Sequence, residues 1–365
     1  MKAFENAKLG GIALKNRLAM APMTTYSANE DLTPSQEELD YLERRSLDVG
    51  MVISPAISVN EYAQAFHRQI TLKDDTFVEP MSELVRTIQN GGAKAIAQLH
   101  HGGRMNDPSL YEDKSAIVSA SAVKAPRKGA VTPRAMDVSD IEATIEDFKV
   151  AALRALRAGF DGVELHGANT YLLQQFFSPH SNIRTDAYGG TLEKRLRFIG
   201  AIVDGVKEVI ENYSERPFIL GYRFSPEELE EDGITMEHTK ELLKFLKQTP
   251  VDYVHVSLQR YNQSSIRDEQ NQTPLVVEFR NVLDGKKPLM ASGNIRTRED
   301  LRHAESLGYD FFAAGVSLLA DPRWGKKVYE GETPKTTFDR ETLPKPLYNR
   351  MKKNRKRFEE KGYSF

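Results

Sequence analysis

The stretch Asp161-Gly-Val-Glu-Leu-His-Gly-Ala-Asn-Thr-Tyr171 places a histidine, an asparagine and a tyrosine directly after a short apolar run. A second stretch, Ser178-Pro-His-Ser-Asn-Ile-Arg-Thr-Asp-Ala-Tyr-Gly-Gly190, follows it and is strongly polar. A buried strand that leads into several polar side chains is typical of a functional site on a rigid scaffold. We therefore expect His166, Asn169 and Tyr171 to belong to a site and not to a core.

Short apolar runs rich in Val, Ile, Phe and Leu recur along the whole chain, and segments with helical periodicity separate most of them. This alternation is the pattern of repeated strand–helix units around a parallel sheet. Eight such runs predict a closed (β/α)8 TIM barrel of the α/β class. The predicted strands are Leu18–Thr24, Met51–Ser58, Ala93–Leu99, Gly162–His166, Phe218–Phe224, Tyr253–Leu258, Leu289–Gly293 and Phe311–Val316.

Several intervening segments carry helix-start signals, in which a hydroxyl or carboxylate side chain caps the first turn. We expect these helices to form the outer layer of the barrel. The predicted starts are Thr33-Pro34 with Gln36, Ser139 with Glu142, and Thr297 with Asp300.

Length and composition describe one globular protein with a small-molecule substrate. A chain of 365 residues is a common size for one α/β barrel, so we expect a single domain over residues 1–365. Its 50 Lys and Arg balance 52 Asp and Glu, which predicts no attraction to nucleic acid or to anionic membranes. Residues 1–8 lack the pattern of a secretion signal, so a cytosolic location is expected. The absence of cysteine excludes disulfides, thiolate metal sites and thiol nucleophiles.

Two segments do not fit a minimal barrel. Residues 101–138, here called the insertion, follow the third predicted strand and are too long for a tight loop, so we interpret them as a partial lid or a short hairpin. Residues 344–365, here called the tail, are rich in Lys and Arg. A solvated terminal helix is the expected structure for the tail, and a nucleic-acid-binding patch is the alternative.

In a TIM barrel the carboxyl ends of all strands face one shared opening, so the residues at those ends are candidates for a site. The adjacent His100 and His101 have no third ligand at a metal-binding spacing, and we predict no metal site. The candidates are Ala21, Pro22, Met23, Thr24, Tyr26, Ala56, Gln98, His166, Asn169, Tyr171, Arg223, Ser292, Gly293, Asn294, Gly315, Val316 and Ser317.

The two quoted stretches resemble the signature of the Old Yellow Enzyme family, flavin-dependent ene-reductases built on a TIM barrel, and the resemblance extends over nearly the whole chain. It implies FMN as cofactor and NADPH or NADH as reductant. Because iron–sulfur clusters need thiolate ligands, the chain resembles the short form that carries flavin alone. The implied acceptors are small enones, nitroalkenes or quinones. Whether the protein forms a homo-oligomer is left open by the sequence.

The resemblance also implies a set of cofactor-binding residues. Gln98 is an amide that can pair with the alternating acceptors and donor of the flavin edge, and Arg223 is a cation that can stabilise the reduced ring. The phosphate would lie at the loops after strands seven and eight. The family usually has arginine where this chain has Val316. The full set is Pro22, Met23, Thr24, Ala56, Gln98, Arg223, Ser292, Gly293, Asn294, Gly315 and Val316.

The same resemblance assigns the substrate end of the site. Hydride transfer from reduced flavin to an alkene builds negative charge on the substrate oxygen, and His166 and Asn169 would donate hydrogen bonds to that oxygen. Tyr171 would then deliver a proton to the neighbouring carbon, because a phenol is protonated at neutral pH. Tyr26 resembles a second substrate-facing tyrosine.

Two alternatives remain at this point. The first is a phosphate-binding aldolase or isomerase barrel, although the chain shows no evident base or Schiff-base lysine for it. The second is a flavin-binding sensor or storage module without turnover. The loop Ser178–Gly190 is here called the polar loop. We interpret three charged residues, Arg184, Asp186 and Arg195, as structural residues that hold this loop in place by ion pairs and hydrogen bonds.

Overall fold

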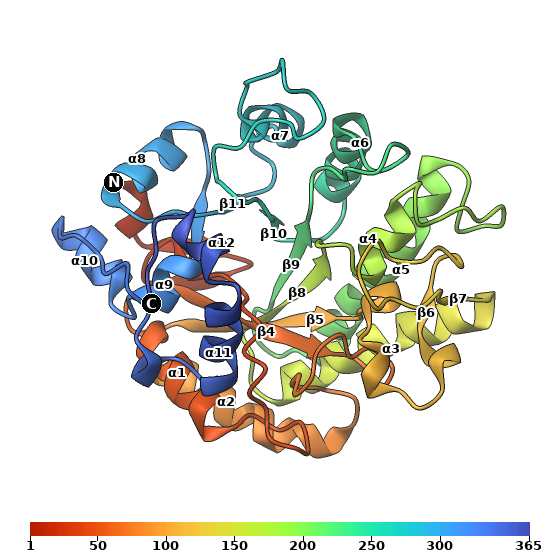
Figure 1. The fold of residues 1–365 in the computed structure, drawn as a ribbon, viewed down its shortest axis with the longest axis horizontal. Helices are drawn as coiled ribbons and strands as arrows, with labels where there is room; N and C mark the ends of the chain where they lie inside the picture. The colour runs from red at the N-terminus through yellow and green to blue at the C-terminus, as the bar shows by residue number, and fades with distance from the viewer.

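The computed structural model describes all 365 residues, and its eight central strands run parallel and close into a barrel (Figure 1). The predicted TIM barrel is confirmed, and each predicted strand has an observed counterpart. Neighbours in the barrel follow the chain order, as repeated strand–helix units require. The strands are β3 (Leu18–Met20), β4 (Met51–Ser58), β5 (Lys94–His100), β8 (Gly162–Gly167), β9 (Ile219–Phe224), β10 (Tyr253–Val256), β11 (Leu289–Ser292) and β12 (Phe311–Ala314).

Helices surround the barrel as an outer ring (Figure 1). Their apolar faces pack against the strands because both faces of a parallel sheet must be covered. No helix is both long enough and apolar enough to cross a bilayer. The helices of the ring are α1 (Gln36–Ser46), α2 (Val78–Asn90), α3 (Val138–Arg157), α4 (Leu172–Phe177), α5 (Leu192–Tyr213), α6 (Met236–Gln248), α7 (Leu275–Leu283), α8 (Arg298–Ser306), α9 (Val316–Ala320) and α10 (Trp324–Glu330).

One of the three predicted helix starts is confirmed. Thr297 caps α8 and forms a reciprocal capping box with Asp300. The other two predictions were wrong by two residues, because another capping side chain lies nearby. Ser35 caps α1, while the Thr33 hydroxyl is bonded to the preceding turn. Asp137 caps α3.

An N-terminal hairpin covers the strand starts. Its strands are β1 (Ala7–Leu9) and β2 (Ile12–Leu14), which pair antiparallel. The buried side chains of the hairpin pack in one apolar cluster with barrel residues such as Ile96 and Phe311. The N-terminal end of the barrel is therefore filled with apolar side chains, and the polar side chains lie further along the strands.

The insertion is not a hairpin. Its two short strands, β6 (Val118–Ser119) and β7 (Arg134–Ala135), pair parallel, whereas the strands of a hairpin pair antiparallel. The chain between them therefore makes a wide loop before it pairs again. The insertion is bonded to the polar loop: Ile183 N donates to Ser121 Oγ at 3.0 Å, and Arg184 Nη1 donates to the Ala120 carbonyl at 2.8 Å.

The three charged residues assigned to hold the polar loop make the expected contacts. Arg184 Nε donates to Asp186 Oδ1 at 3.0 Å. Arg195 Nε donates to the Phe177 carbonyl at 2.9 Å, and its Nη1 donates to the Gly190 carbonyl at 2.8 Å. These bonds tie both ends of the polar loop to the helices beside it.

The tail is helical and its basic residues are exposed, as expected, but its other face packs on the barrel. It forms α11 (Lys345–Lys353) and α12 (Arg355–Glu359), which lie over one side of the barrel in dark blue in Figure 1. Leu347, Met351 and Tyr363 are buried, and the Tyr363 hydroxyl lies 2.9 Å from Ser317 Oγ at the start of α9. The basic residues occupy the outer face of an amphipathic segment, and its apolar face explains the packing that the expectation did not include.

Candidate active site

An aromatic cluster occupies the carboxyl ends of β5 and β8. The Tyr171 ring lies 4.3 Å from the His100 ring and 4.9 Å from the His166 ring, measured between centroids. Phe66 adds an edge contact to Tyr171 at 6.0 Å. The structure thus brings together His166 and Tyr171 and adds His100 and Phe66, which sequence reasoning did not assign. No group of three potential metal ligands is present.

His166 is held as a neutral donor. Its Nδ1 accepts a hydrogen bond from Ala168 N at 3.3 Å, so in the neutral ring the proton sits on Nε2. Burial keeps the pKa of His166 well below its usual range, and the nearby His100 and Arg223 act in the same direction. The side chain therefore offers one N–H group at the end of the barrel.

Asn169 and Thr170 both have a left-handed backbone, with φ of 55° and 64°. Asparagine tolerates this conformation better than most residues, which explains how the chain turns sharply out of β8. The turn is held by Asn169 N, which donates to Ser225 Oγ at 2.9 Å. The side-chain Oδ1 accepts from Ser257 Oγ at 3.0 Å. Its amide N–H groups are left without a partner in the chain.

Tyr171 is the N-cap residue of α4, and its hydroxyl makes no hydrogen bond within the chain. Burial, followed by the neighbouring Tyr26, raises the pKa of Tyr171, so the phenol is protonated at neutral pH. Tyr26 has a left-handed backbone with φ of 57°, and its ring lies 5.6 Å from Phe66. Both tyrosines therefore face the same aromatic cluster.

Arg223 links two parts of the site. It is 8% exposed and forms no ion pair, its Nη2 donates to Ser257 Oγ at 3.2 Å, and its Nε is buried without a partner. Burial lowers the pKa of Arg223, and the neighbouring Glu164 opposes this. Ser257 thus connects Arg223 to Asn169. We missed Ser257 because it lies inside our predicted strand, whereas β10 ends at Val256.

Glu164 lies one inward-facing position before His166 on β8 and is fully buried. Its carboxylate accepts from Gln98 Nε2 at 2.7 Å, from the Tyr253 hydroxyl at 2.9 Å and from His255 Nδ1 at 2.9 Å. Burial raises the pKa of Glu164, but its attraction to His255 and these bonds outweigh that and bring the pKa below its usual value. The carboxylate is therefore charged and fully bonded inside the barrel.

These residues fit the edge of a flavin ring. Gln98 is 1% exposed and uses Nε2 for Glu164, so its Oε1 has no donor in the chain and can accept from the ring N–H. The unpartnered Nε of Arg223 supplies a buried donor and a positive charge. A ligand bound there would pair with both groups and remove the cost of leaving the Arg223 donor unpaired. Ala56, after the irregularity in β4, pairs with Gln98 and lies in the same region.

At the proposed phosphate end, the surrounding atoms leave little room for a side chain at either of the two glycines. Gly293 has φ of 120°, and a Cβ there would lie 2.9 Å from the backbone nitrogen of Arg260. A Cβ on Gly315, the N-cap of α9, would lie 3.1 Å from Met23 Sδ. Asn294 has a buried Oδ1 without a partner.

The remaining candidates lie close to these two turns. Ser292 ends β11 and donates to the Val256 carbonyl at 2.6 Å, and Val316 begins α9. Pro22, Met23 and Thr24 follow β3, the strand that pairs with β12. The cofactor-binding role of these residues stays a proposal.

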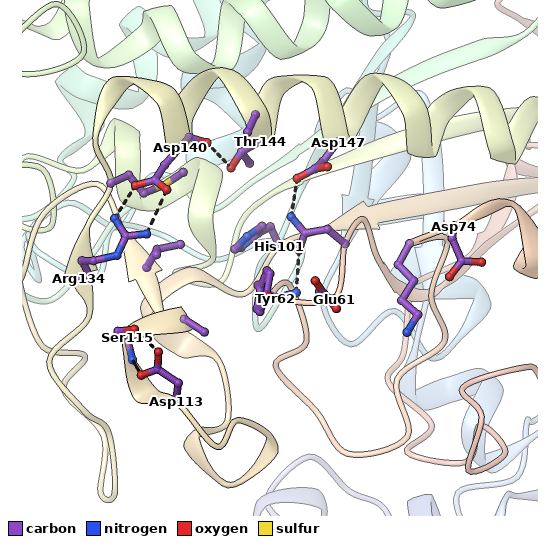
Figure 2. Close-up of a pocket in the computed structure, with 16 residues that line it drawn as sticks. Glu61, Tyr62, Asp74, His101, Asp113, Ser115, Arg134, Asp140, Thr144 and Asp147 are labelled. Atoms are coloured by element: carbon purple, nitrogen blue, oxygen red, sulfur yellow. Dashed lines mark hydrogen bonds and ion pairs between the residues drawn. The ribbon is translucent and has the colours of Figure 1, made fainter.

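A cavity of about 750 Å³ lies beside α3, and its lining includes none of the residues proposed to bind flavin or substrate (Figure 2). It is bounded by α3 and the insertion, and Figure 2 shows Asp140, Thr144 and Asp147 of α3 along one side. His101 reaches it from the end of β5, while the preceding His100 packs on Tyr171.

A model of the NADH:flavin oxidoreductase / NADH oxidase family matches residues 2–334 of this sequence. The chain belongs to this family. A probable NADH-dependent flavin oxidoreductase, YqiG of Bacillus subtilis (strain 168), is 41% identical over 346 residues, which are 93% of this chain and 92% of that protein. NADH:fumarate oxidoreductase of Klebsiella pneumoniae (strain 342) is 39% identical over 346 residues, but the chain spans only 37% of its length.

The fold comparison agrees with the family. The structure of the old yellow enzyme homologue from Zymomonas mobilis superposes with a TM-score of 0.81 at 25% identity, covering 94% of this chain and 96% of that one. The resemblance to the Old Yellow Enzyme family is therefore confirmed. The description of the family names an oxidoreductase activity with NADH and flavin. Membership in this family of enzymes argues against both alternatives, the aldolase or isomerase barrel and the sensor without turnover.

Proposed function

We propose that this NADH:flavin oxidoreductase reduces the C=C bond of small α,β-unsaturated carbonyl or nitro compounds. One observation carries the proposal: the hydrogen bonds within the chain leave three groups free at the carboxyl end of β8 and in the turn that follows it. These are the Nε2–H of His166, the amide N–H of Asn169 and the hydroxyl of Tyr171. Two fixed donors and one protonated phenol are the groups that an enolate-forming reduction needs.

The donors act on the oxygen of the acceptor. Bound FMN would supply the two-electron chemistry that links the nicotinamide coenzyme to the alkene. His166 and Asn169 would hold the carbonyl or nitro oxygen while negative charge builds on it. Each is oriented before the substrate arrives, His166 by Ala168 and Asn169 by Ser257. Preorganised donors of this kind contribute about 3 kcal/mol each to the transition state.

Tyr171 would give its proton to the α-carbon, and bulk water would restore it. Burial keeps the phenol protonated, so the proton is in place before the reduction begins. Gln98 and Arg223 would hold the flavin edge, and Arg223 would favour the reduced, negatively charged ring. The names of two similar proteins, the fumarate oxidoreductase and morphinone reductase, support acceptors with an activated alkene.

The test is Tyr171→Phe, followed through the two half-reactions by stopped-flow absorbance of the flavin. We expect NADH or NADPH to bleach the flavin at an unchanged rate and cyclohexenone to restore its colour about a hundredfold more slowly, the usual size of a general-acid contribution. A quinone acceptor takes its protons on oxygen from water and should react normally. Tyr213→Phe, on an exposed side chain of α5, is the control. Equal slowing of both half-reactions would refute the role of Tyr171.

A further inference from the structure

The side-chain amide of Gln98 is held in one orientation by Glu164. Gln98 Nε2 donates to Glu164 Oε1 at 2.7 Å, and both side chains are buried. A side-chain amide carries an oxygen on one side and N–H donors on the other, so fixing one side fixes both. An ionised carboxylate can only accept hydrogen bonds, so it faces the N–H side. The oxygen of Gln98 is therefore the atom that stays free.

The second oxygen of Glu164 is occupied as well. Its Oε2 accepts from the Tyr253 hydroxyl and from His255 Nδ1, each at 2.9 Å. Three donors that meet one carboxylate favour its ionised form. None of these donors can turn to water instead, because Gln98, Tyr253 and His255 are all buried. The carboxylate thus connects β5 with β10 inside the barrel, and neither of its oxygens is free.

The strand beside Glu164 leaves room for this arrangement. Gly221 of β9 lies in register with Glu164 of β8. A Cβ on Gly221 would lie 2.2 Å from Cζ of the Tyr253 ring, far closer than van der Waals contact allows. The missing side chain lets the Tyr253 ring pass β9 and place its hydroxyl on Glu164. Packing as well as hydrogen bonding therefore fixes which donors meet Oε2.

We propose that Glu164 is a positioning residue that makes Gln98 a hydrogen-bond acceptor for the flavin. This role rests on the proposed placement of Gln98 at the flavin edge, and it belongs to a side chain that would not itself contact the cofactor. Oxidised flavin offers a ring N–H at that edge, which needs an acceptor. A reversed Gln98 amide would instead bring two N–H groups together and leave both without a partner.

The substitution Glu164→Gln tests this role, because the two donors on Oε2 decide how the new amide would lie. Its oxygen would stay with Tyr253 and His255, so its N–H side would face Gln98. Gln98 would then turn its own oxygen away from the flavin. We expect the affinity for oxidised FMN to fall about tenfold, the size of one hydrogen bond lost with its partner left unpaired. Fluorescence titration of the FMN-free protein measures this affinity.

A second substitution should reverse the first. In the double variant with Glu164→Gln and Gln98→Glu, the new carboxylate accepts from the new amide and keeps its other oxygen for the flavin. We expect the affinity for oxidised FMN to return to within about threefold of the wild-type value. The negative charge now lies next to the ring, so binding of reduced, anionic FMN should stay weak. Each tenfold change in the ratio of the two affinities lowers the reduction potential by about 30 mV.

Two further variants separate this role from a loss of stability. Gln98→Met removes the amide, so adding Glu164→Gln to it should weaken FMN binding no further if Glu164 acts through Gln98. Glu228→Gln is the matched control, because Glu228 is also buried and accepts from a glutamine, Gln174 Nε2, at 2.6 Å. It should leave FMN affinity unchanged. Urea unfolding of each FMN-free variant shows whether its fold is intact.

If Glu164→Gln does not fold, Gln98→Glu alone decides the question. Its carboxyl group would need a proton to donate to Glu164 while its carbonyl oxygen faces the flavin. Two carboxyl groups that share a site raise one pKa, so FMN affinity should be near the wild-type value at about pH 5.5 and fall about tenfold by about pH 8.5. Burial opposes a charge on Tyr253 or His255, and Arg223 keeps its charge, so these neighbours add no step.

Several outcomes would overturn the inference. Unchanged FMN affinity of Glu164→Gln would mean that Gln98 keeps its orientation without the carboxylate. Additive losses from Glu164→Gln and Gln98→Met, or no recovery in the double variant, would mean that Glu164 acts by another route. An equal loss in Glu228→Gln would assign the effect to buried carboxylates in general. A wild-type protein that binds FMN as described and yet reduces no enone would contradict only the proposed alkene reduction.

Discussion

Two polar layers lie inside the same barrel, one inward-facing position apart. In the lower layer, Glu164 receives hydrogen bonds from Gln98, Tyr253 and His255, and the carboxylate is fully buried. In the upper layer, His166 and its neighbours leave donors without partners in the chain. The residue types are similar, and the difference lies in whether their hydrogen bonds are complete.

The comparison separates stability from function. A saturated buried network holds side chains in one arrangement, and breaking it leaves uncompensated polar groups in a medium of low dielectric. Free donors at the next layer are costly for folding unless a ligand meets them, which is why they mark the site. The lower layer also supports the upper one, because Gln98 donates a hydrogen bond to Glu164 and the negative charge of Glu164 stabilises the positive charge of Arg223.

The largest effect should come from breaking the lower layer. Glu164→Ala leaves three buried donors without an acceptor and removes the countercharge of Arg223, so we expect a loss of about 4 kcal/mol in the free energy of unfolding. Urea unfolding of the FMN-free protein measures it. Asn169→Gly, which removes an exposed side chain of the upper layer, should cost less than about 1 kcal/mol. Glu164→Gln, which keeps one acceptor, should fall between them. Comparable losses in the free energy of unfolding for Glu164→Ala and Asn169→Gly would contradict the distinction between the two layers.

The next effect concerns the free donors of the upper layer. His166→Ala combined with Asn169→Ala should weaken binding of a phenolate such as 4-nitrophenolate about a hundredfold, because its negative oxygen imitates the enolate. Titration by flavin absorbance measures the dissociation constant. His67→Ala, on a side chain that is 65% exposed, serves as the control. Undiminished phenolate binding by the double variant would mean that the substrate oxygen lies elsewhere.

The smallest effect tests how the upper layer is oriented. Ser257 is a positioning residue, since its hydroxyl donates a hydrogen bond to Asn169 Oδ1 and accepts one from Arg223 Nη2. Ser257→Ala should weaken phenolate binding about fivefold, the size of one neutral hydrogen bond, with little change in thermal stability. Ser257→Thr keeps the hydroxyl and should restore the affinity, and Ser109→Ala is the exposed control. If phenolate affinity falls only in proportion to stability, Ser257 has a structural role alone.

Sequence reasoning predicted the barrel well because its signals are local. Strands buried on both faces are continuous apolar runs, as in Met51–Ser58 of β4, and such runs are visible without any tertiary information. It also placed His166, Asn169, Tyr171, Gln98 and Arg223 at strand ends, which a barrel must bring to one opening. The helix starts at Ser35 and Asp137 were missed because several capping residues stood within two positions of one another.

The sequence by itself determined the strand–helix repeat, the family and the strand-end residues, since each depends on residue types at short and regular spacings. Only the tertiary structure decided which atoms of those residues stay free. His166 donates through Nε2 because Ala168 occupies Nδ1, and Asn169 donates because Ser257 occupies its oxygen. It also decided that Arg350 of the tail lies over the ring of Tyr26, more than three hundred residues away in the sequence. Such contacts depend on how distant segments pack in three dimensions, and no local pattern in the chain encodes that.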